Sequence, residues 1–123
     1  MPLIIVVTGP NNGDYHPIGE QPVLIGRDDK CDLQIVDPVV SRRHCRVDYD
    51  LGRGVAMITH LGSTNGMRVN DREVPASTDL QDGDVIHIGD TLLLYSAKEA
   101  PDVQEAVNNF RMKRAAKHST LIR

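Results

Sequence analysis

Aromatic residues are nearly missing from this chain: they make up 3% of its 123 residues, with no tryptophan and one phenylalanine. A hydrophobic core must therefore be built from aliphatic side chains. Apolar runs are short as well, and none approaches the roughly 18 residues that a membrane-spanning helix needs. The opening "MPLIIVVTGP" lacks a basic region and a small-residue cleavage site, so we interpret it as a strand. We expect a cytoplasmic protein without membrane contact.

Cysteines are equally sparse. Cys31 and Cys45 show no C-x-x-C spacing, and disulfides are rare in the cytoplasm, so we expect no disulfide framework. In "HCRVDYD", Cys45 alternates with charged residues in step with Val47 and Tyr49. This period of two predicts that Cys45 lies on the buried face of a strand.

Signals for catalysis or metal binding are lacking. The five histidines are scattered without paired-ligand spacing, and no Walker-type glycine loop or G-x-S-x-G elbow occurs. An enzyme would have to pair Ser41 with His44, and side chains three residues apart at the start of a strand need not meet. We therefore expect no metal, no cofactor and no enzymatic activity.

Positive charge is scarce in most of the chain, whose formal net charge is −3. Residues 1–110 hold 9 Lys and Arg against 17 Asp and Glu, whereas residues 111–123 hold five Lys and Arg and no acid. An acidic body lacks the broad basic face that nucleic-acid phosphates require, which argues against nucleic-acid binding. One stretch interrupts this pattern: "VVSRRHCRV" at 39–47 contains three arginines, a serine and a histidine, and no acid.

What the sequence does contain is a series of short apolar runs bounded by turn residues such as "NNGD" at 11–14. No convincing helical period occurs before residue 98. Many short strands at this spacing predict an all-β sandwich or barrel. The runs are "PLIIVVTG", "PVLIG", "DLQIV", "HCRVDYD", "GVAMITHL", "MRVN", "REV" and "DVIHIGDTLLLYS".

The last part of the chain has a different pattern. Asp102 with Glu105 three residues later forms a capping box, and apolar residues then recur at helical spacing up to Phe110. We divide the chain into a domain at 1–98 and a basic helical tail at 99–123. The helix is expected to dock Phe110 on the sandwich, with a flexible linker as the alternative.

The tail also suggests a weaker hypothesis. Ser119 and Thr120 in "KHSTLIR" could be phosphorylated and bind to another copy of the chain, which would give weak head-to-tail self-association.

Candidate binding residues occur in the predicted loops. Loops of a sandwich cluster at its ends, so segments that are distant in sequence can meet there. Guanidinium groups and hydroxyls are suited to a phosphate group. The acid-free stretch is therefore interpreted as part of a site for one small dianion rather than for a polyanion. The loop residues are Gly26 and Arg27, then Ser41, Arg42 and Arg43, then Ser63, Thr64, Asn65 and Gly66.

These pieces together resemble the signature of the forkhead-associated (FHA) domain family. The matching motifs are "GR" at 26–27, "SRRH" at 41–44, "STNG" at 63–66 and "VN" at 69–70. The resemblance covers about residues 3–97 and implies an eleven-stranded β-sandwich whose apical loops bind phosphothreonine peptides.

The resemblance also implies a role for each matching residue. Arg27, Ser41, Arg42 and Thr64 are expected at the phosphate, and Asn65 is expected to bind the peptide main chain. Residues expected to support the site are Gly26, His44, Gly66 and Asn70. Two positions depart from or vary within the family pattern. Met67 stands where threonine is common. Val39 is uncharged, and we expect it to favour an apolar residue in the bound peptide at the third position after the phosphothreonine.

The function that follows is a phosphothreonine-peptide-binding adaptor in Ser/Thr kinase signalling, whose partner is a protein phosphorylated on threonine. The alternative is a structural scaffold subunit with the same fold in which the phosphate site is not used.

Overall fold

The computed structural model describes residues 1–97 and 102–121, with side chains up to residue 113. Its described part contains eleven strands and one helix. The elements are β1 (Leu3–Val6), β2 (Tyr15–Pro17), β3 (Val23–Gly26), β4 (Leu33–Gln34), β5 (Cys45–Asp50), β6 (Val55–His60), β7 (Arg68–Val69), β8 (Arg72–Glu73), β9 (Ser77–Leu80), β10 (Val85–Ile88), β11 (Thr91–Ser96) and α1 (Val103–Leu121).

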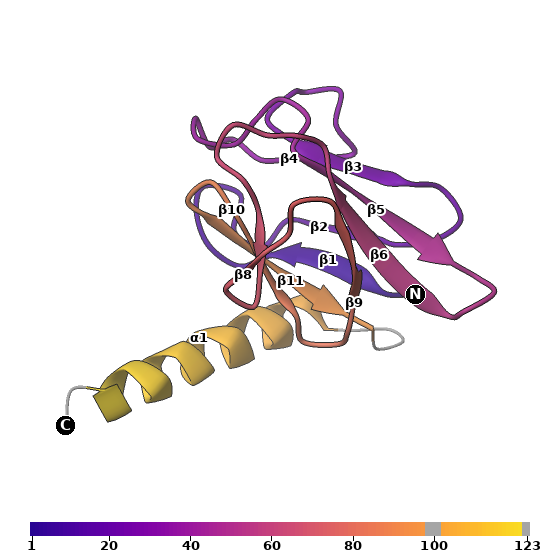
Figure 1. The fold of residues 1–123 in the computed structure, drawn as a ribbon. Helices are drawn as coiled ribbons and strands as arrows, with labels where there is room; N and C mark the ends of the chain where they lie inside the picture. Colours follow the sequence, from indigo (N-terminus) through magenta and orange to yellow (C-terminus); the bar gives the residue numbers. More distant parts are fainter. Residues whose placement is uncertain (98–101, 122–123) are drawn as a thin grey trace.

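The strands form two sheets (Figure 1). A six-stranded sheet has the order β2-β1-β11-β10-β7-β8, and a five-stranded sheet has the order β4-β3-β5-β6-β9. Neighbouring strands are antiparallel except β3 and β4, which run parallel. The predicted all-β sandwich with an added C-terminal helix is confirmed.

The space between the sheets is filled almost entirely by aliphatic side chains. On β1, Ile4 and Val6 face this core together with Leu93 of β11, and all three are completely buried. Cys45 is also completely buried, as its alternation predicted, and burial raises the pKa of its thiol to about 12. Cys31 and Cys45 are both free thiols.

The outer face of the six-stranded sheet carries a second apolar layer against α1. Leu3 and Ile5 of β1 are buried there together with Val107 of the helix. This explains why the first strand is apolar at every position: one face meets the sandwich core and the other meets α1. The helix begins as predicted, because the Asp102 carboxylate accepts a hydrogen bond from the Glu105 backbone N–H at 3.1 Å.

The first turns of α1 lie against the sheet and its C-terminal half extends beyond it (Figure 1). Among the described residues, no helix has both the length and the apolar character needed to cross a bilayer. Ser119 and Thr120 lie in the helix, but their side chains are outside the described part of the chain. The self-association hypothesis therefore stays a prediction, as does the division at residue 98.

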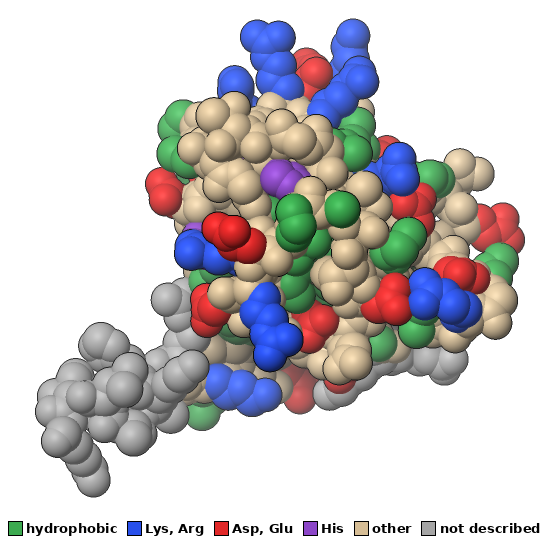
Figure 2. Space-filling view, viewed as in Figure 1, with side chains coloured by type: hydrophobic (Ala, Val, Ile, Leu, Met, Phe, Trp, Pro, Cys, Tyr) green, Lys and Arg blue, Asp and Glu red, His purple; other side chains and the backbone are tan. Residues whose placement is uncertain are grey.

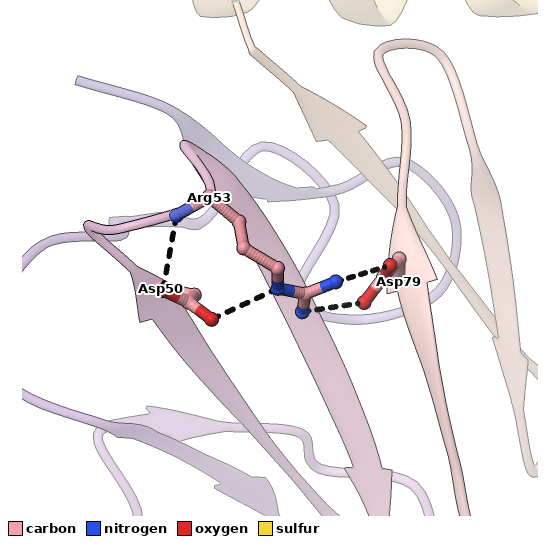
Figure 3. Close-up of polar contacts among 3 residues, drawn as sticks. All are labelled: Asp50, Arg53 and Asp79. Carbon is pink, nitrogen blue, oxygen red and sulfur yellow. Dashed lines mark hydrogen bonds and ion pairs between the residues drawn. The ribbon is translucent and has the colours of Figure 1, made fainter.

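At the end of the sandwich where β5 turns into β6, Arg53 joins two strands (Figure 3). Its Nε donates to Asp50 at 2.9 Å, and its two terminal nitrogens donate to Asp79 of β9 at 2.9 and 3.0 Å. The guanidinium of Arg53 lowers the pKa of both carboxyl groups. This exposed ion pair links the β5–β6 turn to β9, which is paired to β6 through its backbone.

Candidate functional site

Three loops meet at the end of the sandwich opposite the β5–β6 turn (Figure 1). We name them the first loop (27–32), the second loop (35–44) and the third loop (61–67). The first two are joined by backbone hydrogen bonds: the Arg27 N–H donates to the Ser41 carbonyl oxygen at 3.0 Å, and the Asp28 N–H donates to that of Arg42 at 3.1 Å.

Gly26 allows this close contact between the first and second loops. A Cβ atom at residue 26 would lie 2.2 Å from the Arg42 carbonyl oxygen, which is far inside van der Waals contact. Only glycine fits at this position without a shift of the backbone.

Arg27 and Asn65 hold the second loop from two sides. The Nε of Arg27 donates to the Val40 carbonyl oxygen at 3.0 Å, and the Nδ2 of Asn65 donates to the Val39 carbonyl oxygen at 2.8 Å. Residues from three separate parts of the sequence therefore surround the backbone just before Ser41.

Several hydrogen-bond donors remain unpaired at this end. In the described part of the chain, the terminal guanidinium nitrogens of Arg27 and the hydroxyl of Ser41 make no hydrogen bond to protein. Arg42 and Thr64 are exposed at the tips of their loops. Figure 2 shows Lys and Arg side chains projecting from this end of the molecule. The arrangement offers guanidinium groups and hydroxyls to one anion.

His44 connects the second and third loops from below. Its Nδ1 accepts a hydrogen bond from the Ser41 backbone N–H at 3.1 Å, so the proton of the neutral ring is assigned to Nε2, which donates to the Gly66 carbonyl oxygen at 2.7 Å. Burial lowers the pKa of His44, and the nearby His60 lowers it further. The ring contacts the backbone of Ser41 rather than its hydroxyl, so the geometry is not that of a nucleophile and its base.

The sequence placed Ser63 in a loop but assigned no role to Ser63 or to His60. The Ser63 hydroxyl lies 2.9 Å from the Nε2 of His44 and also contacts the Nε2 of His60. The Ser63 backbone N–H donates to the same His60 nitrogen at 3.1 Å. Ser63 follows His60 by three residues, a spacing that could have indicated a local turn.

Asp37 was missed as well. Its buried carboxylate accepts hydrogen bonds from the Val39 N–H at 2.9 Å, the Asp90 N–H at 2.8 Å and the Thr91 hydroxyl at 2.9 Å. Burial alone would raise the pKa of Asp37, but these three donors bring it below its ordinary value. Asp37 thereby fastens the second loop to the turn between β10 and β11.

Asn70 lies outside this loop cluster. Its φ is 50°, and its side chain donates to Asp84 at 2.8 Å and accepts from the Val85 N–H at 2.9 Å. It therefore braces the β7–β8 turn against the start of β10. Gly66, by contrast, has a φ of 74° within the third loop.

The described residues contain no group of three or more His, Cys, Asp or Glu side chains placed to hold a metal ion. The terminal guanidinium nitrogens of Arg27 and the hydroxyl of Ser41 are free to donate there, which suits an anion.

Comparison with known proteins agrees with this geometry. The profile of the FHA domain family matches residues 23–89. The chain is 34% identical to the FHA domain-containing protein FhaB of Mycobacterium tuberculosis over 91 residues, which are 73% of this chain and 57% of FhaB. It is 40% identical over 67 residues to the ABC transporter ATP-binding/permease protein Rv1747 of the same organism, covering 54% of this chain and 7% of that protein. The chain thus spans less than two thirds of these relatives.

Solved structures show the same architecture. A structure from an analysis of phosphothreonine-dependent FHA domain interactions has a TM-score of 0.71 and 30% identity, covering 80% of this chain and 97% of that one. The FhaA FHA domain complexed with the intracellular domain of Rv3910 has a TM-score of 0.69 and 30% identity, covering 77% of this chain and 99% of that one. The chain belongs to the FHA domain family.

Proposed function

We propose that this chain binds threonine-phosphorylated segments of partner proteins through its three loops, without catalysis or cofactor, as an adaptor in Ser/Thr kinase signalling. The observation that supports this most directly is that Arg27 and Asn65 flank the backbone before Ser41 while keeping donor groups unpaired.

In this proposal the terminal nitrogens of Arg27 and the Ser41 hydroxyl bind the phosphate oxygens. Arg42 and Thr64 add contacts at the rim, and Asn65 binds the peptide main chain. A phosphothreonine carries close to two negative charges at neutral pH, and each charge-assisted hydrogen bond contributes about 1.5–3 kcal/mol. A few such bonds are enough for micromolar affinity, which corresponds to about 8 kcal/mol.

Two related structures support this assignment of ligand class. One solved structure comes from work on phosphothreonine-dependent FHA domain interactions, and Mycobacterium tuberculosis EmbR, with a TM-score of 0.70 and 25% identity, was solved with a low-affinity phosphopeptide. The signalling context of this chain is inferred from these proteins and belongs to the proposal.

The test is binding of a phosphothreonine peptide library, followed by affinity measurement on the selected peptides. We expect binding to require the phosphate, and Ser41→Ala to weaken it by about tenfold or more, because one charge-assisted bond is lost. Ser41→Ala is informative because the hydroxyl has no partner within the described structure, so the fold is expected to be unchanged.

Arg27→Ala should abolish detectable binding, and Arg72→Ala is its matched control because Arg72 is an exposed arginine on β8, outside the three loops. If no library member binds, or if Arg27→Ala and Arg72→Ala behave alike, the phosphate site is unused and the scaffold alternative is correct.

A further inference from the structure

A groove of about 370 Å³ lies beside the third loop. It starts at Asn65, continues past the β7–β8 hairpin and also reaches the turn after β10. A volume of this size holds one or two side chains of a peptide, at the lower end of the range for small-ligand sites. The lining residues are His60, Asn65, Gly66, Met67, Arg68, Glu73, Val74, Pro75, His87 and Gly89.

The groove has apolar and charged parts. Met67 and Val74 are buried, so they supply an apolar floor. Arg68, Glu73 and His87 stand in register across β7, β8 and β10, and Arg68 is the middle residue of this row. On the face shown in Figure 2, a histidine and a group of hydrophobic side chains lie side by side below the loop end.

Two imidazole rings, those of His60 and His87, line this groove. The Nδ1 of His87 accepts a hydrogen bond from the Nη2 of Arg68 at 3.1 Å, so the neutral ring carries its proton on Nε2. The Nε2 of His60 accepts from the Ser63 N–H, so the neutral ring carries its proton on Nδ1. Within the described structure neither of these two N–H groups has a protein partner.

Arg68 adds a positive charge beside His87. Glu73 is its neighbour on β8, but no ion pair joins the two side chains among the described residues. The guanidinium of Arg68 therefore keeps donors for a ligand. The guanidinium of Arg68 is suited to an anionic group. The carboxylate of Glu73 also lines the groove, and it repels a dianion more strongly than a monoanion.

We propose that this groove binds an acidic side chain, Asp or Glu, of the same partner segment whose phosphothreonine occupies the loops. The inference rests on the proposed function, because continuity through Asn65 connects the two regions: Asn65 lines the groove and also bonds the second loop at Val39. Arg68 makes the main contact with the carboxylate, and the His60 and His87 N–H groups add hydrogen bonds.

The test uses phosphothreonine peptides with an alanine background, in which one glutamate is moved through each position on either side of the phosphothreonine. We expect one position at which glutamate binds about fivefold more tightly than glutamine, as for a partly exposed ion pair. At that position Arg68→Glu should reverse the preference to lysine. Arg72→Glu, the same change on the neighbouring strand and outside the groove, should keep the preference for glutamate.

Each other result would overturn the inference in a distinguishable way. If every position is indifferent to glutamate while binding still requires the phosphate, the groove is not an acidic subsite and the proposed function stands. If phosphoserine at the selected position binds more tightly than glutamate, the groove takes a second phosphate instead. If no peptide binds in a phosphate-dependent manner, the proposed function fails and the inference fails with it.

Discussion

The amide nitrogen of Asn65 lies 2.8 Å from the carbonyl oxygen of Val39, a residue 26 positions earlier in the chain. One amide hydrogen is thus used to hold the second loop, while the other hydrogen and the amide oxygen remain for a ligand. Arg27 likewise has two roles, because its Nε donates to the Val40 carbonyl oxygen while its terminal nitrogens remain for a ligand. The side chains proposed to bind the peptide also preorganise the loops, which lowers the entropic cost of binding.

Asn65→Asp is expected to impair both roles of this residue. The new carboxylate cannot donate to the Val39 carbonyl oxygen and adds negative charge beside the proposed phosphate, so peptide affinity should fall by about tenfold or more. Fluorescence anisotropy with a selected phosphothreonine peptide measures this. Asn12→Asp makes the same charge change in the exposed turn before β2 and should leave affinity unchanged. Equal affinity for both variants would remove Asn65 from the site.

Gly26→Ala is expected to destabilise the fold by about 3 kcal/mol, the upper part of the usual range for overpacking. The added Cβ would lie 2.2 Å from the Arg42 carbonyl oxygen, so the backbone joining the first and second loops must move. Urea unfolding gives the free energy. In the control Gly52→Ala, the Cβ approaches only the exposed carboxylate of Asp50 at 3.3 Å, and a small change is expected. A stable Gly26→Ala variant would mean that this contact is not tight.

The strands with clear alternation could be predicted from the sequence because one face meets the core. Cys45 and Val47 on β5 show this: both are completely buried, and Arg46 between them is exposed. The strand β9 could not be predicted from an apolar run. Its sequence "STDL" has one buried residue, and pairing with β6 and the ion pair between Asp79 and Arg53 place it in the sheet.

The loop residues of the candidate site and the supports Gly26 and His44 were predicted from the sequence, whereas the contacts of Ser63 and Asp37 were not. Ser63 acts through contacts with His44, 19 positions away, and Asp37 acts through Thr91, 54 positions away. Such contacts depend on how the loops fold over one another, and local sequence patterns carry no record of that. Asn70 was predicted as a support from its place in a motif, and its hydrogen bonds lie at the β7–β8 turn rather than in the three loops.

Asp37→Ala is expected to lower the free energy of unfolding by about 2–3 kcal/mol, because it leaves buried donors of Asp90 and Thr91 without an acceptor. The second loop would also lose its attachment to the turn after β10, so peptide affinity should fall although Asp37 is not proposed to touch the ligand. Chemical denaturation and peptide titration measure the two effects. Asp90→Ala is the control, because its exposed side chain is removed while its backbone N–H still binds Asp37.

The stability of the fold should decrease as the pH falls below the ordinary pKa of histidine, about 6.5. Burial lowers the pKa of His44 in the folded state, so below that pH the unfolded chain binds the proton first and is favoured. The full contribution of neutral His44 is therefore present above the unfolded pKa and is lost as the pH drops toward the folded pKa. Denaturation of wild type and His44→Gln at several pH values checks this.

In that comparison the wild type should show the steeper loss of stability through the weakly acidic range, and His44→Gln should be less stable at neutral pH but less dependent on pH. His60→Gln separates the contribution of the neighbouring ring, which lowers the pKa of His44. Parallel pH curves for wild type and His44→Gln would show that His44 is not the group responsible.

Val107→Asp tests whether α1 is part of the folded unit. Val107 is 3% exposed and packs with Leu3, Ile5 and Val7 on the outer face of the six-stranded sheet. The substitution removes a buried valine side chain and places a carboxylate in an apolar contact, where it loses its hydration. The folded state is therefore expected to be destabilised by about 3 kcal/mol. Asn108→Asp places the same side chain on the exposed face of the helix and should change little. If only Val107→Asp is destabilised, the folded domain extends beyond residue 98 into the first turns of α1. If both variants unfold like the wild type, residues 99–123 are a separable tail and the sandwich is stable without them.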